Sequence, residues 1–75
     1  MDCVLWQVDK FEAALSPVEQ VRRALVAVAA RHGRRPTVVQ VRAGAVEWPA
    51  EIDGARIVPT KLASYPGVML LGWEA

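Results

Sequence analysis

The feature that most constrains the fold is a complete helix start signal followed by a stop about four turns later. Ser16 can accept a hydrogen bond from the backbone N–H of Glu19, and Glu19 can reach back to the N–H of Ser16. Pro17 occupies the first helical position, where its missing N–H costs nothing. Gly33 is placed to end the helix in a left-handed conformation, and Pro36 prevents its continuation. The sequence therefore predicts a helix over residues 17–32.

One face of this predicted helix is apolar. Its members recur at the spacing of helical turns, which is typical of a helix that packs on another layer. They are Val18, Val21, Leu25, Val28, Ala29 and His32. On the opposite side, Glu19 and Arg23 are four residues apart and in the order that favours an ion pair. We expect the apolar row to face a sheet.

Four further segments have the composition of β-strands: residues 3–8, 37–42, 55–60 and 68–73. In the first, Val4, Trp6 and Val8 would share one face. In the second, the inward residues would be Val39, Val41 and Ala43, with Gln40 and Arg42 outward. Residues 9–15 would form a loop or a short helical turn, and residues 46–48 are a candidate for an additional short strand.

The connections between these strands predict a mixed sheet. The first link contains the helix and is long enough for a right-handed crossover between parallel strands. Turn signals at Asp53-Gly54 and at residues 65–67 precede the last two strands. Pro59 marks the third as an edge strand or a strand end, whereas the unbroken apolar run of the fourth predicts a central or interface position.

The predicted fold is α+β, in the order β-α-β-β-β, with one amphipathic helix on a small mixed four-stranded sheet. We expect residues 1–75 to form a single domain, because a chain this short has too little interior for two cores. One helix covers only one face of such a sheet. The other face is predicted to form a homodimer contact through some of Trp6, Trp48, Trp73, Val58 and Leu70. Alternatively, the tryptophans fill the core.

Charge is segregated along the chain. Residues 20–46 contain six arginines and no acidic residue, whereas the flanks hold all eight acidic residues and three basic ones. Arg31, Arg34 and Arg35 surround the predicted helix end, and Arg42 is predicted to extend this basic corner. Such a corner can dock an acidic protein partner or contact nucleic acid phosphates. It can also be an ordinary solvated surface that meets the helix dipole.

Residues with catalytic potential do not form a recognisable motif. His32 is expected to be partly buried at the helix end, without a nucleophile in a motif context. Cys3 is the only cysteine, so it offers neither a disulfide nor a metal pair, and the carboxylates are expected to be solvated charges. We therefore predict a protein that is not an enzyme, with no metal and no cofactor.

Location and source are predicted from composition. The longest apolar run, residues 24–30, is too short to cross a membrane, and the first residues lack a basic and then apolar signal. We expect a cytoplasmic protein. Asparagine is absent, seven arginines accompany two lysines, and there are five prolines, which fits a GC-rich and heat-loving source.

Three stretches, residues 32–39, 54–59 and 66–72, resemble the helix-strand-strand piece in the peripheral domain of tailed-phage major capsid proteins. The resemblance implies a small protein of phage or mobile-element origin, and no functional residue is carried over from it. The sequence as a whole predicts a self-associating interaction module with an acidic protein partner. The alternative is a small nucleic-acid-associated protein.

Overall fold

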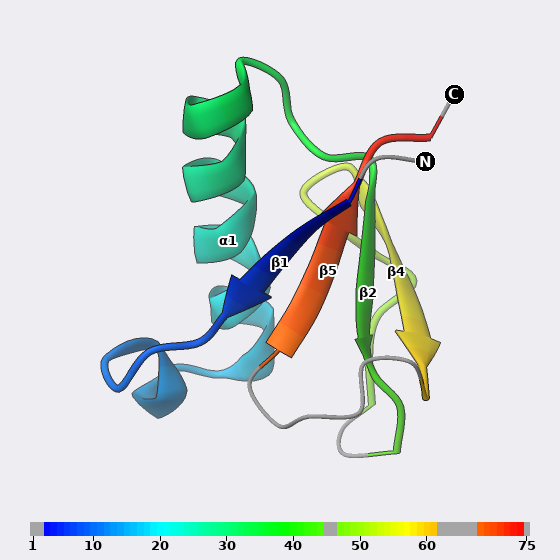
Figure 1. The fold of residues 1–75 in the computed structure, drawn as a ribbon. Helices are drawn as coiled ribbons and strands as arrows, with labels where there is room; N and C mark the ends of the chain where they lie inside the picture. Colours follow the sequence, from blue (N-terminus) through cyan, green and yellow to red (C-terminus); the bar gives the residue numbers. More distant parts are fainter. Residues whose placement is uncertain (1–2, 45–46, 62–67, 75) are drawn as a thin grey trace.

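The structure of the protein is a computed structural model that describes residues 3–44, 47–61 and 68–74. A short 3-10 helix, η1 (Glu12–Ala14), precedes the α-helix α1 (Pro17–His32). The strands are β1 (Cys3–Gln7), β2 (Val38–Arg42), β3 (Glu51–Ile52), β4 (Ala55–Thr60) and β5 (Val68–Gly72). Figure 1 shows α1 lying across one face of the sheet.

The strands form one mixed sheet in the order β1-β5-β2-β4-β3. β5 pairs antiparallel with both β1 and β2, so β1 and β2 run in the same direction, as predicted. They are not neighbours, however, because β5 lies between them. This position confirms that the last strand is central. The first and last described strands meet with Cys3 opposite Gly72.

The predicted α+β class is confirmed, but the predicted count of four strands is wrong. The additional strand is β3, which pairs antiparallel with β4. Asp53 and Gly54, with φ of 48° and 86°, form the two-residue turn between them. Two positive φ angles in succession match the twist of a tight hairpin, so this turn pairs the residues on either side of it.

The candidate strand at residues 46–48 is not observed at Glu47 and Trp48, and Val46 lies outside the described residues, as does the turn predicted at residues 65–67. In β4, the N–H of Ile57 donates to Ala50 on the side away from β2. Strand alternation places the nitrogen of Pro59 on that same side, beyond the end of β3. Its missing donor therefore interrupts no pairing with β2. Pro59 is the next-to-last residue of β4, which agrees with the predicted strand end, whereas the predicted edge strand is wrong because β4 lies between β2 and β3.

The helix boundaries agree with the prediction. The Ser16 hydroxyl accepts a hydrogen bond from the N–H of Glu19 at 3.3 Å, and Gly33, with φ of 76°, donates its N–H to Ala29. The predicted pair of Glu19 with Arg23 is wrong, because the Glu19 carboxylate contacts Arg22 instead, at 2.7 Å. Residues three apart are also helix neighbours, and Arg22 reaches a second carboxylate from this position.

The core lies between α1 and the face of the sheet beneath it. From α1 it takes Val21, Ala24, Leu25 and Val28, which pack over the buried residues of the central strands. From the sheet and the residue after β5 it takes Val39, Val41, Ile52, Ala55, Ile57, Met69, Leu71 and Trp73. Val4 and Trp6 of β1, and Val8 just after it, pack against this core, as the predicted alternation requires.

Three predicted burials need correction. Ala24 is fully buried although the apolar row did not include it, because it lies three residues after Val21 and four before Val28 on the same side of the helix. His32 is exposed because α1 ends beside it. Ala43 is also exposed, since β2 ends at Arg42.

We expect Leu25→Ala to lower the free energy of unfolding by about 2–5 kcal/mol, because Leu25 is 1% exposed and the change leaves a cavity under α1. Val26→Ala is the matched control, since Val26 is the next residue and is 69% exposed. Its effect should stay below about 0.5 kcal/mol. Chemical denaturation followed by circular dichroism measures both, and equal losses would contradict the assigned helix face.

Candidate functional site

A group of basic side chains surrounds the end of α1. Arg31, His32, Arg34 and Arg35 are all exposed, and they are called the basic corner from here on. The left-handed conformation of Gly33 turns the chain off the helix axis between them. Residues of the last turn and of the following loop therefore come to one end of the molecule, near the start of β2 (Figure 1).

Trp73 forms the base of the basic corner. It is only 8% exposed, and the His32 ring packs on it with centroids 5.3 Å apart. The guanidinium carbon of Arg34 lies 4.8 Å from the centre of the indole ring. A cation over an aromatic face is held by electrostatic attraction as well as by packing. Trp73 thus fixes the position of the Arg34 charge without neutralising it.

The β3–β4 hairpin holds a second arginine of the corner. Arg35 donates a hydrogen bond from Nη2 to the backbone carbonyl of Asp53 at 3.1 Å. The Asp53 carboxylate is engaged by Arg22, whose Nε lies 3.3 Å from Oδ2. The hydrogen bond to Glu19, followed by the attraction of Asp53, raises the pKa of Arg22 above its already high ordinary value. Arg22 is therefore a paired charge, whereas Arg35 forms no ion pair with a carboxylate in the described part of the chain and donates to a neutral carbonyl.

Another carboxylate at this end of the sheet is also paired. Glu74 accepts from Arg56 at 2.8 Å, and its backbone N–H donates to the Thr37 hydroxyl at 2.7 Å. Within residues 3–44, 47–61 and 68–74, neither Arg31 nor Arg34 forms an ion pair with a carboxylate. The basic corner consequently presents positive charge that the described part of the chain does not balance.

Arg42 is separated from the other predicted partner-binding residues. The basic corner lies next to the beginning of β2, whereas Arg42 is its last residue. Four residue steps along a strand span about 13 Å. The structure therefore brings together Arg31, Arg34 and Arg35 and places Arg42 at the opposite end of the sheet.

The three tryptophans lie on the helix side of the sheet. Trp73 belongs to the core, and Trp6 and Trp48 are partly buried against it. The Trp48 indole also donates from Nε1 to the carbonyl of Arg42 at 3.3 Å. The placement agrees with the alternative that tryptophans fill the core, and it leaves the opposite face of the sheet to other residues.

The face of the sheet opposite α1 carries a continuous row across four strands. The pairing registers place Leu5 beside Leu70, Leu70 beside Gln40, and Gln40 beside Val58. Val58 and Leu70 were predicted on this face, and both are partly buried, whereas Leu5 is 64% exposed. We call this row the open face. The alternation of β1 already signals Leu5, because it points away from Val4 and Trp6.

Other chemical features of the described residues are few. No group of three histidine, cysteine or acidic side chains within them is arranged to hold a metal ion. No α-helix in the same ranges is both long and apolar enough to span a membrane. Cys3 begins β1, as predicted, and is exposed.

Searches of known protein families, of curated proteins and of solved structures found no match to this chain. The resemblance to a capsid-protein segment therefore gains no support from them. The geometry of the chain's own residues has to carry the functional argument.

Proposed function

We propose that the protein is a non-enzymatic interaction module that docks an acidic surface of a partner protein on Arg31, Arg34 and Arg35. The observation that carries this proposal is the unbalanced charge of the basic corner. Nearby carboxylates that could neutralise it are taken by Arg22 and Arg56. Guanidinium groups bind carboxylates through paired hydrogen bonds, which makes them suited to an acidic protein surface.

The corner is also partly ordered before a partner arrives. Arg34 rests on Trp73, and Arg35 is tied to the hairpin through the Asp53 carbonyl. A side chain that is already held loses less conformational freedom on binding, so less of the interaction energy is spent on ordering it. This supports recognition by a defined surface rather than a purely nonspecific attraction.

The alternative proposal is that the partner is a nucleic acid. In that case the protein would be a small nucleic-acid-associated protein of phage or mobile-element origin. Arginines contact phosphates as readily as carboxylates. Single-stranded nucleic acids, however, also need exposed aromatic rings for base stacking. The aromatic ring at the corner, Trp73, is buried beneath His32 and Arg34. This arrangement favours the protein partner.

We expect Arg34→Glu to weaken binding of a fluorescent polyglutamate peptide by about tenfold or more at low salt, since attraction becomes repulsion at the centre of the corner. Arg42→Glu makes the same charge change at the far end of β2 and should have little effect. Fluorescence anisotropy at low and high salt measures both variants. If the two variants lose peptide affinity equally, the loss reflects the net charge of the protein alone. That result would contradict binding at the basic corner.

Generic double-stranded DNA is titrated in parallel. Salt-sensitive DNA binding that exceeds polyglutamate binding and is lost in Arg34→Glu would favour the nucleic-acid alternative. Circular dichroism spectra that match the unmodified protein ensure that each variant is folded.

The open face supports the second part of the proposal, self-association into a homodimer. Leu5, Leu70 and Val58 supply apolar surface that α1 does not cover, with Gln40 between Leu70 and Val58, and an extended apolar patch is unusual on a monomer. A second copy would cover the patch with its own apolar row through a two-fold axis. Here the contact is proposed through these aliphatic residues and not through the tryptophans.

Sedimentation at tens of micromolar tests this contact. We expect a dimer for the unmodified protein and a monomer for Leu5→Glu, because a charge buried in the contact would be left unpaired. Val26→Glu is the control, since Val26 is similarly exposed but lies on α1. A monomeric unmodified protein would rule out self-association through this face.

Location in the cytoplasm and a heat-loving source are also proposed, on the composition of the chain alone. Cell fractionation tests the location. A thermal unfolding midpoint in the ordinary mesophile range would count against the proposed source.

A further inference from the structure

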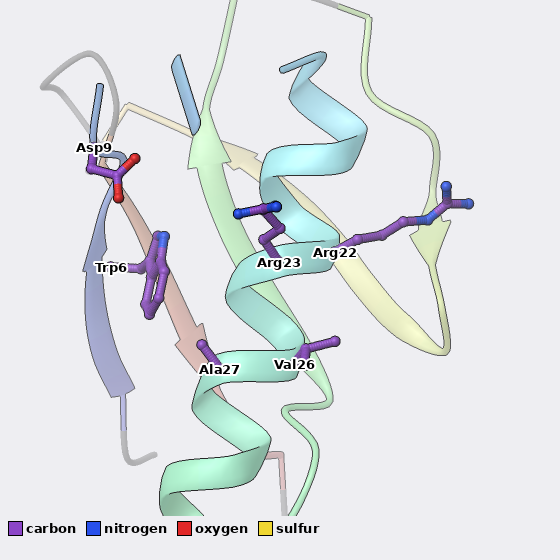
Figure 2. Close-up of a pocket in the computed structure, with 6 residues that line it drawn as sticks. All are labelled: Trp6, Asp9, Arg22, Arg23, Val26 and Ala27. Carbon is purple, nitrogen blue, oxygen red and sulfur yellow. The ribbon is translucent and has the colours of Figure 1, made fainter. Parts of the chain in front are cut away.

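A groove of about 550 Å³ lies between β1 and α1, at some distance from the basic corner (Figure 2). Its walls are formed by Trp6 and Asp9 on one side and by Arg22, Arg23, Val26 and Ala27 of α1 on the other. This size lies in the range of ligand sites in proteins. Val26 is 69% exposed, so the groove offers apolar surface that the described part of the chain does not cover.

The Trp6 wall supplies a hydrogen-bond donor without an acceptor. Its Nε1 is buried, and no acceptor among the described residues lies within hydrogen-bonding reach. A buried N–H left without an acceptor is unfavourable by about 1–3 kcal/mol, and an acceptor supplied by a ligand would relieve this. Trp6 lines the groove, but Nε1 itself has almost no exposed surface, so an acceptor would reach it from the groove once the side chains that cover it move aside.

The opposite wall supplies a cation. Figure 2 shows the Arg23 side chain extending from α1 toward the wall that bears Trp6 and Asp9, whereas Arg22 points the other way. Arg22 is paired with Glu19 and Asp53, but Arg23 forms no ion pair within the described residues. The Trp6 N–H and the Arg23 guanidinium therefore lie on opposite walls of the groove. A carboxylate is suited to this arrangement, because it can accept from one group and pair with the other. The Asp9 carboxylate on the Trp6 wall disfavours a doubly charged phosphate.

The third element of the groove is the side of β1 that faces away from β5. Among the described strands, β1 is the last in the sheet order and pairs with β5 alone. Alternate residues along its five positions therefore direct backbone N–H and C=O groups away from the described sheet. Addition of an extended peptide to such an edge, beside a helix that supplies side-chain contacts, is a recurring mode of peptide recognition.

We propose that this groove binds an extended peptide segment of a partner protein, added as a strand beside β1, with a glutamate or aspartate side chain between Trp6 Nε1 and Arg23. Neighbouring apolar side chains of the peptide pack on Val26 and Ala27. The site goes beyond the proposed function, because it uses residues 22–27 of α1 and the edge of the sheet, whereas the basic corner lies where the helix ends.

The experiment titrates isotope-labelled full-length protein with a pool of short capped peptides in which β-branched residues surround a central glutamate. Two-dimensional NMR follows the indole N–H signals. We expect the Trp6 indole signal to move downfield as its donor gains an acceptor, together with backbone amides of β1. The Trp73 indole is the internal control, because its Nε1 is also buried without an acceptor but lies outside the groove.

Matched variants and probes test each part of the site. Arg23→Gln should weaken binding about tenfold, whereas Arg31→Gln, the same change at the far end of α1, should leave it unchanged. A pool with central glutamine should bind more weakly, and a pool methylated on alternate backbone nitrogens should lose strand addition.

Three results would overturn the proposal. They are no movement of the Trp6 signal at peptide concentrations up to about 1 mM, equal binding by Arg23→Gln, and signal changes confined to the basic corner. The last result would leave the proposed function intact. Loss of polyglutamate binding in Arg34→Glu with unchanged binding in the groove would show the two sites to be independent.

Discussion

The packing of Val21, Leu25 and Val28 on the two central strands is the interaction on which the rest of the structure depends. These side chains are almost completely buried, and they lie over Val39 and Leu71, which are fully buried. Because α1 covers only this face of the sheet, the position of α1 determines where the candidate sites lie. The basic corner lies where the helix ends, the groove lies along its flank, and the open face lies on the far side of the sheet.

Ion pairing divides the arginines into two groups with different roles. Arg22 and Arg56 form ion pairs that join α1 to the hairpin and β4 to the segment after β5. All of these side chains are exposed, so each pair contributes little to stability. Their larger effect is on charge, because they engage carboxylates that would otherwise be available to Arg34 and Arg35.

The sequence was sufficient to predict elements whose signals are local. Ser16, Pro17 and Gly33 mark the helix ends through backbone chemistry. The unbroken apolar run of β5 reflects its central position in the sheet, with Met69 and Leu71 buried and Leu70 partly buried. β3 escaped prediction because two residues are too few to show alternation. The order of the strands was not predicted either. The parallel directions of β1 and β2 were predicted correctly, but no local signal in the sequence shows that β5 lies between them.

The candidate sites were less predictable because they depend on which residues the fold brings together. Arg42 follows Arg35 closely in sequence, yet β2 carries it to the other end of the sheet. Trp6 and Trp73 were candidates for the sheet face that the helix leaves uncovered, although the alternation of β1 already placed Trp6 with Val4 and Val8. The groove could not be seen in the sequence at all, because Trp6 and Arg23 face each other only after β1 takes an edge position.

The pairing of Cys3 with Gly72 has a consequence for the molecule as part of a larger assembly. The first and last described strands meet at the end of the sheet that carries the basic corner (Figure 1). Any polypeptide joined ahead of β1 or behind β5 would leave the fold there, close to Trp73 and far from Arg42. Such a fusion would hold its attached domain beside the arginines, and a short linker joining the two ends would leave the core undisturbed.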